Sequence, residues 1–218
     1  MNKRNQQRYE ETQARILDVA QVLVQQNGFE RLSLREIARH VEYSPAALYE
    51  YYDGKDHIID SLCERIDARI AAYMQEALPT QLAAPGELTF SANLQELIDA
   101  PLWDVEPAAP SLVLLSLRYL QFSQHCSDDF QLLYRRTLLP DTLEQVWQVF
   151  CSAAEQAFDT FELSAEAGKE TVASAFWSMA HGFALLSLNR QGTLPLSGDA
   201  LKETATHALM SLHSGYRD

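Results

Sequence analysis

The stretch from Leu32 to Ile58 constrains this chain most, because it holds two short helical patterns separated by only a few residues. Ser33 with Glu36 three residues later forms a capping box, which predicts the start of a helix. Ser44 followed by proline predicts a second start, since proline suits the first helical position. Two short helices joined by a tight turn make a helix-turn-helix, a motif whose second helix enters the major groove of DNA.

The residue types in both helices fit this interpretation. Apolar residues of the first recur at helical spacing on one face, namely Leu34, Ile37, Ala38 and Val41. In the second, which we expect to run from Ser44 to Tyr52, only Leu48 and Tyr52 are needed for a core. The small residues at its start let the backbone approach base edges, and tyrosine hydroxyls reach phosphates. The predicted DNA contacts are Ser33, Arg35, Ser44, Pro45, Ala46, Ala47, Tyr49, Tyr51 and Lys55.

Lys55 lies in the first turn of a following helix, where the helix dipole disfavours a cation. A bound anion relieves that penalty, and a DNA phosphate is the natural one. The alternative is that Lys55 is a solvated charge and that Tyr49 and Tyr51 are ordinary half-buried rings.

This stretch resembles the DNA-binding domain of the TetR family of bacterial transcriptional regulators. The resemblance rests on the order and spacing of Ser33, Ile37-Ala38, Val41-Glu42-Tyr43-Ser44, Leu48-Tyr49, Tyr51-Tyr52 and Lys55. It implies an all-α protein with a three-helix DNA-binding domain at residues 1–54 and a helical effector-binding and dimerisation domain at 55–218.

Glu42 departs from the family pattern, which has glycine in the turn between the two helices. A glutamate there must either adopt a left-handed conformation, at an energetic cost, or change the turn. It also places a negative charge near the presumed DNA face.

The charge of the chain is unevenly distributed, although its total of −13 looks wrong for a DNA-binding protein. Residues 1–57 hold eight Lys or Arg and nine Asp or Glu, a net −1, so residues 58–218 carry the remaining −12. The acidic residues at 58–218 repel DNA from all of the protein except its N-terminal segment. The alternative is that this charge only keeps the protein soluble. Lys3, Arg4 and Arg8 form a basic arm expected ahead of the first helix, able to touch phosphates.

Composition and motifs exclude several other classes. The chain of 218 residues is 47% hydrophobic, enough for a sizeable core, but has no apolar run long enough to span a membrane. Its N-terminus lacks a signal peptide, and three scattered cysteines indicate reduced thiols, so we expect a cytoplasmic protein. The sequence has no HExxH, GxSxG, P-loop or glycine-rich nucleotide turn, so we expect neither an enzyme, a metal site nor a cofactor.

Helical periodicity continues through the rest of the chain. It predicts a long helix from 55 to about 78. This helix runs from the DNA-binding domain into the rest of the chain, so it can transmit movement between the two. A loop rich in proline and containing Trp103 is expected at 101–110. The other predicted helices are 9–27, 89–100, 111–126, 141–158, 164–189 and 201–212.

The two last helices are the most apolar. Paired with their copies across a two-fold axis, they would bury a four-helix interface; the alternative is an intrachain core. Trp177, His181 and Gly182 are similar to a Trp-x-x-x-His-Gly signature of one TetR subgroup. That resemblance implies dimerisation through these helices and an effector pocket among the central ones, with His181 either in the pocket or hydrogen-bonded in the core.

The body offers aromatic and aliphatic helices with few polar groups, which suits an organic effector. The candidate effector-binding residues are Arg118, Tyr119, Phe122, Tyr134, Trp147, Trp177 and His181. We therefore expect a homodimeric regulator, a repressor, that binds a palindromic operator and is released by a small organic effector. Two other hypotheses remain: a helical small-molecule carrier or enzyme without sequence-specific DNA binding, and a protein-interaction module that uses its acidic helices.

Overall fold

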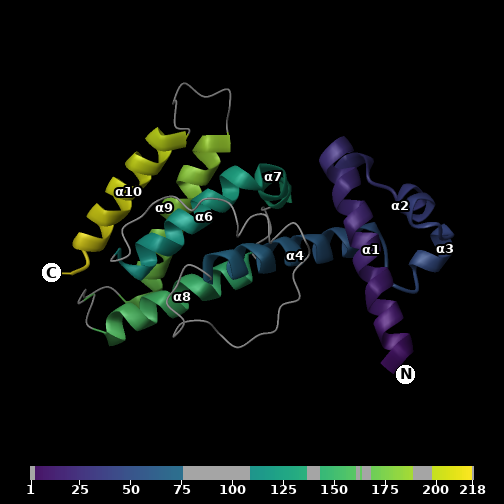
Figure 1. Ribbon diagram of the computed structural model, residues 1–218, viewed down its shortest axis with the longest axis horizontal. Coiled ribbons are helices and arrows are strands. Elements are labelled where there is room, and N and C mark those ends of the chain that lie inside the picture. The colour runs from purple at the N-terminus through teal and green to yellow at the C-terminus, as the bar shows by residue number, and fades with distance from the viewer. Residues whose placement is uncertain are drawn as a thin grey trace. The chain divides into compact units, whose positions relative to one another are not determined.

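The computed structural model describes residues 3–75, 109–136, 143–160, 163, 168–188 and 198–217 (Figure 1). All regular structure in these residues is helical, which confirms the predicted all-α fold. The predicted helix at 89–100 lies outside the described residues, as does the predicted loop up to residue 108, with Trp103.

Contacts between Cα atoms divide the chain into two compact units. Unit 1 comprises Met1–Ile66 with Gln131–Thr142, and unit 2 comprises Asp67–Phe130 with Leu143–Asp218. The helix that begins at Lys55 therefore contributes residues to both units. The division proposed from the sequence, at residues 54 and 55, falls just before that helix and stays a prediction.

Unit 1 begins with α1 (Lys3–Asn27), which contacts the short 3-10 helix η1 (Phe29–Arg31) and helix α2 (Leu34–Val41). Helix α2 in turn contacts α3 (Pro45–Leu48). The expected apolar face of α1 is buried: Ile16, Leu17, Ala20, Leu23 and Val24. Gly28 ends the helix with φ of +79°, as its sequence position predicted.

The predicted basic arm at the N-terminus was wrong. Helix α1 begins at Lys3 rather than near residue 9, so Lys3, Arg4 and Arg8 lie on a helix and not on an arm ahead of it. The polar first turns carry hydrogen bonds between side chains four residues apart, Gln6 to Glu10 and Gln7 to Glu11. Such pairs support a helix where no apolar periodicity announces one.

The long helix is α4 (Lys55–Gln75). Each apolar position that the spacing predicted to be inward is buried: Ile58, Ile59, Leu62, Ile66, Ile70 and Tyr73. Helix α4 therefore has an apolar face along its described length and links the two units through one continuous backbone.

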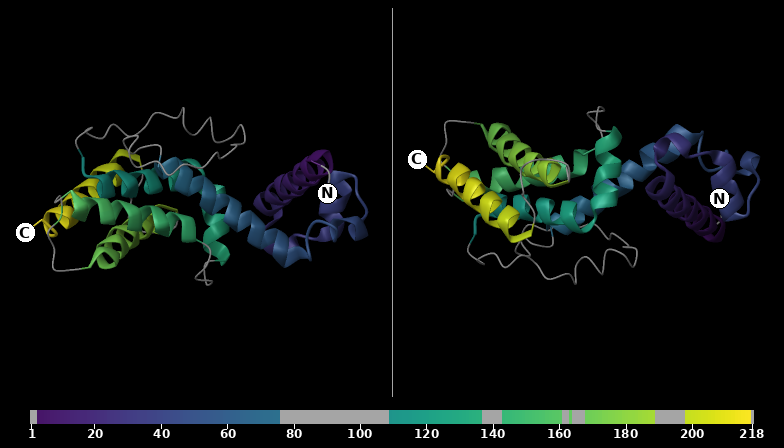
Figure 2. Two further views of the ribbon diagram at one scale, coloured as in Figure 1. Left: turned by 90° about the horizontal axis from the view of Figure 1, so that it is seen from below. Right: turned by 90° about the horizontal axis from the view of Figure 1, so that it is seen from above.

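Unit 2 is a bundle of α6 (Ser111–His125), α8 (Glu144–Asp159), α9 (Lys169–Leu188) and α10 (Gly198–Ser214). Helix α6 contacts α8, α9 and α10, and α9 contacts α8 and α10. Figure 2 shows α9 and α10 beside α6 from two sides. The bounds of these helices lie within a few residues of the predictions wherever both ends are described.

Helix α7 (Ser127–Arg136) was missed by the sequence analysis. It follows α6 directly, because Cys126 leaves the helical region with φ of −110° and ψ of 46° and so starts a new helix direction. Asp128 and Asp129 lie in its first turn, where acidic side chains favour a helix.

Candidate DNA-binding site

Serine caps build the two short helices of the site, as the sequence predicted. The Ser33 hydroxyl accepts a hydrogen bond from the Glu36 backbone N–H at 3.2 Å. The Ser44 hydroxyl accepts one from the Ala47 N–H at 3.1 Å, with proline at the first helical position. Each cap satisfies a backbone donor that the helix start leaves unpaired.

Glu42 adopts the left-handed conformation that the turn requires, with φ of 61° and ψ of 37°. Its own N–H and that of Tyr43 both donate to the Ala38 carbonyl, which closes α2. It is the only residue other than glycine with positive φ in the described part of the chain. The turn geometry therefore persists with a side chain in place of hydrogen, at the cost of strain.

The second helix is shorter than expected. Regular α-helix covers Pro45–Leu48, and a turn replaces the rest of the predicted helix. The N–H groups of Glu50 and Tyr51 donate to carbonyls three residues back, at 3.2 and 3.0 Å, which tightens the turn. Leu48 and Tyr52 are buried as predicted, and the Tyr52 hydroxyl donates to the Gln13 carbonyl of α1.

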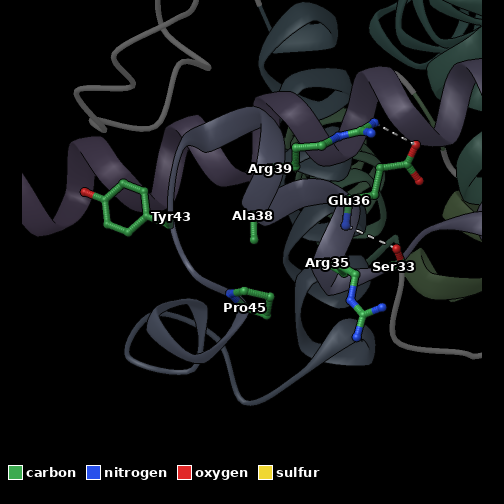
Figure 3. A pocket seen from close by; sticks show the side chains of 7 residues that line it. All are labelled: Ser33, Arg35, Glu36, Ala38, Arg39, Tyr43 and Pro45. Carbon is green, nitrogen blue, oxygen red and sulfur yellow. Dashed lines mark hydrogen bonds and ion pairs between the residues drawn. The ribbon is translucent and has the colours of Figure 1, made fainter.

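A groove of about 470 Å³ lies between α2 and the start of α3. Ala38 and Pro45 line it on an apolar side, and two arginines border it (Figure 3). Arg35 was predicted from the sequence, whereas Arg39 was not, although it lies one helical turn further along α2. The Arg39 side chain is 75% exposed, and its nearest carboxylate, on Glu36, is 3.9 Å away. Both arginines are thus available to phosphate oxygens or base edges.

Tyr43, which lines the same groove, was also missed by the sequence analysis. It is 38% exposed, and Tyr49 is 59% exposed. The sequence contained a signal for Tyr43, because the Tyr-Ser-Pro run places this aromatic residue directly before the cap of the second helix.

Tyr51 lies in a different environment from Tyr49. Its ring stacks on Tyr9 of α1, with centroids 4.9 Å apart, and meets the Tyr43 ring edge-on at 6.1 Å. Burial raises the pKa of Tyr51, and a hydrogen bond with Thr12 opposes that rise. The structure thus gives Tyr51 contacts that join α1 to the turn after α3, while its predicted DNA contact stays a prediction.

These environments predict opposite effects of removing one hydroxyl. We expect Tyr49→Phe to weaken operator binding roughly tenfold, the effect of about one lost hydrogen bond to a phosphate, with an unchanged melting temperature. Tyr51→Phe should instead lower the melting temperature and change affinity less. Anisotropy titrations of labelled duplex and thermal melts of both variants would test this, and the reverse pattern would contradict it.

Lys55 is the first residue of α4, and its Nζ donates to the Glu30 backbone carbonyl of η1 at 3.5 Å. This long contact gives the cation a partner inside unit 1. A DNA phosphate as a further partner stays a prediction. Of the nine predicted DNA contacts, Ser33, Arg35 and Pro45 line the groove, and the others follow along α3 to the start of α4.

The predicted effector residues form two groups in unit 2. In the first, Tyr119 of α6 and His181 of α9 share a hydrogen bond of 2.7 Å between Oη and Nδ1. Trp177 lies one helical turn before His181, with ring centroids 6.2 Å apart, and Trp147 of α8 meets Trp177 at 5.7 Å. We call Tyr119, Trp147, Trp177 and His181 the aromatic cluster.

Burial controls the protonation of this cluster. It raises the pKa of Tyr119 far above its usual value and lowers that of His181, so both groups are neutral near pH 7. The Trp177 Nε1 atom is buried and lacks a hydrogen bond of good geometry in the described residues. It still lies close enough to Tyr119 to oppose part of the rise in its pKa. The cluster therefore combines apolar rings with a few polar groups, and its role in effector binding stays a prediction.

Arg118 and Phe122 form the second group, on another face of α6. The Arg118 guanidinium carbon lies 5.1 Å from the centroid of the Tyr73 ring, and Phe122 meets the same ring at 5.9 Å. The side chain of Tyr134, the last predicted effector residue, lies outside the described part of the structure.

Comparisons with known proteins agree with this geometry. A family model, "Bacterial regulatory proteins, tetR family", matches residues 16–62, which span most of unit 1. No curated protein sequence matches the chain.

Solved structures match the chain over nearly its whole length. A protein of unknown function from Rhodococcus sp. RHA1 has a TM-score of 0.67 at 19% identity, covering 95% of this chain and 96% of its own. A TetR-family transcriptional regulator from Pectobacterium atrosepticum has a TM-score of 0.64 at 17% identity, covering 99% and 97%. One from Streptomyces coelicolor has a TM-score of 0.59 at 20% identity, covering 95% and 83%.

The closest agreement between sequence, geometry and comparisons is in the helix-turn-helix. The residues that the family model matches include both serine caps, Ser33 and Ser44, and the buried Ile37 and Leu48. Residues 16–62, which hold the helix-turn-helix, therefore match the TetR-family model, and the chain as a whole has the fold of TetR-family regulators.

Proposed function

We propose that this protein is a transcriptional repressor that binds a palindromic operator as a homodimer and leaves it when a small organic effector binds. The observation that carries the proposal is the exposed surface around α2 and α3. Arg35, Arg39 and Tyr43 line a groove beside a serine-capped helix, and Tyr49 is exposed directly after that helix. Two such faces related by a two-fold axis would meet successive major grooves, roughly 34–36 Å apart.

The surface of α9 supports the dimer. Helix α9 is mostly apolar, but the chain itself buries only Val172, Ala173, Phe176, Ala180 and Ala184 of it, and most of its other residues are half-buried. Leu186 of α9 and Met210 of α10 are 46% and 39% exposed, and Gly182 leaves room for close approach. A second copy that presents the same two helices would cover these side chains.

Helix α9 also has the length and composition of a membrane-spanning helix. This is weak evidence for a membrane, because α9 packs against α6, α8 and α10. A surface between two copies accounts for its apolar residues equally well and needs no lipid.

The aromatic cluster is the proposed effector site. It spans α6, α8 and α9, so a ligand that separates or orders its rings would alter the packing of three helices of unit 2. We call the exposed surface of α2 and α3 in each protomer its reading face. The protein leaves the operator if the effector binds more tightly to a form in which α4 is displaced, because the two reading faces of the dimer then no longer match the half-sites. The loss of operator affinity cannot exceed the difference in effector affinity between the two forms.

Selection of bound duplexes from a random DNA pool, at two salt concentrations, tests the DNA-binding part of the proposal. We expect a palindromic site whose enrichment survives the higher salt, because base contacts persist when phosphate contacts are screened. Enrichment without symmetry would contradict the dimer. Binding that vanishes with salt at every sequence would contradict operator recognition and favour the small-molecule carrier instead.

A further inference from the structure

Helix α8 takes its N-terminal cap from another helix. Its own N-cap residue is Leu143, which has no side-chain acceptor. The carboxylate of Asp67, on α4, accepts hydrogen bonds from the backbone N–H groups of Gln145 at 2.8 Å and Val146 at 3.1 Å. These are the two donors that a local cap would satisfy, and the negative charge also suits the positive end of the helix.

A second buried contact holds the next residues of α4. The Arg69 guanidinium donates to the Asp129 carboxylate in the first turn of α7 at 2.6 Å. Their side chains are 13% and 5% exposed, and Asp67 is 3% exposed. We call Asp67 and Arg69, with their partners on α8 and α7, the α4 clamp.

The position of the clamp along α4 is informative. Asp67 is the first residue of α4 that belongs to unit 2, and Arg69 follows it. Arg65, two residues before Asp67, belongs to unit 1 and donates to Asp18 and Gln21 of α1, both at 2.6 Å. Within the five residues from Arg65 to Arg69, the hydrogen bonds of α4 thus change from partners in unit 1 to partners in unit 2.

These contacts differ from apolar packing in one respect. An apolar helix face tolerates small shifts along its neighbour. Two hydrogen bonds that one carboxylate accepts instead fix both the position and the rotation of α4 relative to the start of α8. Displacement of α4 along α8 would leave a buried carboxylate and two helix N–H groups unsatisfied.

The clamp is also within electrostatic reach of the aromatic cluster. The charge of Asp67 contributes to the raised pKa of Tyr119, after the larger effect of burial. Tyr119 in turn holds His181 through its hydroxyl. Tyr119, which the effector is proposed to contact, therefore interacts electrostatically with Asp67, the carboxylate that fixes α4.

We infer that Asp67 is a positioning residue for operator recognition: by capping α8 from α4, it fixes α4 in the orientation in which the two reading faces of the dimer match the half-site spacing. This inference rests on the proposed function, since it assigns to that function the residue that sets its geometry. Asp67 itself does not contact DNA.

The test measures spacing selectivity with the full-length protein and the operator found by selection. One base pair inserted between the half-sites moves them about 3.4 Å apart and rotates one relative to the other. We expect wild type to lose affinity steeply with each inserted or deleted pair. In Asp67→Ala the ratio between the best and the altered spacing should fall at least tenfold, within the usual range of coupling between sites.

Two further variants separate positioning from simple destabilisation. Asp67→Asn keeps one acceptor in nearly the same volume and should give a smaller loss of selectivity, which preserves the test if Asp67→Ala does not fold. Val113→Ala removes buried volume from α6 and leaves every polar group of the clamp in place, so it should lower the melting temperature but keep the wild-type spacing ratio. Circular dichroism at the assay temperature shows that each variant is folded.

The outcomes are distinct. A folded Asp67 variant with the wild-type spacing ratio overturns the inference while operator binding by wild type stands. Equal loss of selectivity in Val113→Ala also overturns it, because a general loss of stability would then suffice. Failure of wild type to select any operator is a failure of the proposed function itself, and it is seen before any variant is made.

Discussion

Leu186→Glu should convert the dimer into monomers and reduce operator affinity by roughly a hundredfold or more, since linking two binding modules contributes about 10² to 10⁴ in affinity. Leu186 is 46% exposed on α9, in the surface that we propose a second copy covers. Across a two-fold axis the same residue comes from both protomers, so each dimer would bury two unpaired carboxylates. Burying an unpaired charge in an apolar interface is strongly unfavourable.

Val22→Glu is the matched control. Val22 is 49% exposed and also apolar, but it lies on α1 in the DNA-binding unit. Sedimentation equilibrium should find Val22→Glu dimeric and Leu186→Glu monomeric, with native helix content in both. A dimeric Leu186→Glu protein that binds the operator normally would show that the interface lies elsewhere.

Glu42→Gly should raise both the stability of the DNA-binding unit and its affinity for DNA. Glycine adopts φ of 61° without the penalty that a side chain incurs, so we expect the free energy of unfolding to rise by about 1 kcal/mol. Removing a negative charge beside the groove should also tighten operator binding, by about tenfold at low salt and less at high salt.

Two other substitutions at this position separate conformation from charge. Glu42→Asn is neutral and tolerates the left-handed region, whereas Glu42→Gln is neutral but does not. If strain dominates stability, Gly and Asn should raise the melting temperature and Gln should not. If charge dominates affinity, all three should bind DNA more tightly. Weaker binding by all three would mean that the Glu42 carboxylate assists recognition.

The local features of the DNA-binding unit could be predicted from the sequence because they depend on residues close together in the chain. Each serine cap acts on an N–H three residues away, and the burial of Ile37 and Leu48 follows from helical spacing. For Glu42 the sequence left two alternatives, a left-handed conformation or a changed turn, and the structure shows the left-handed one.

Prediction failed where local signals were weak or contacts were distant. The polar start of α1 has no apolar periodicity, and α3 is shortened by a turn that packs Tyr51 against Tyr9, forty-two residues earlier in the chain. Helix α7 was missed because the chain continues from α6 without glycine or proline to mark the change.

The sequence by itself determined the helical class of the fold, the caps of the helix-turn-helix, and the inward faces of most helices. Only the tertiary structure decided which polar groups meet: Asp67 with the start of α8, Arg69 with Asp129, and Tyr119 with His181. Periodicity tells which face of a helix is buried, but not which residue of another helix lies opposite. That choice depends on how the helices pack, and it determines where a buried charge finds its partner.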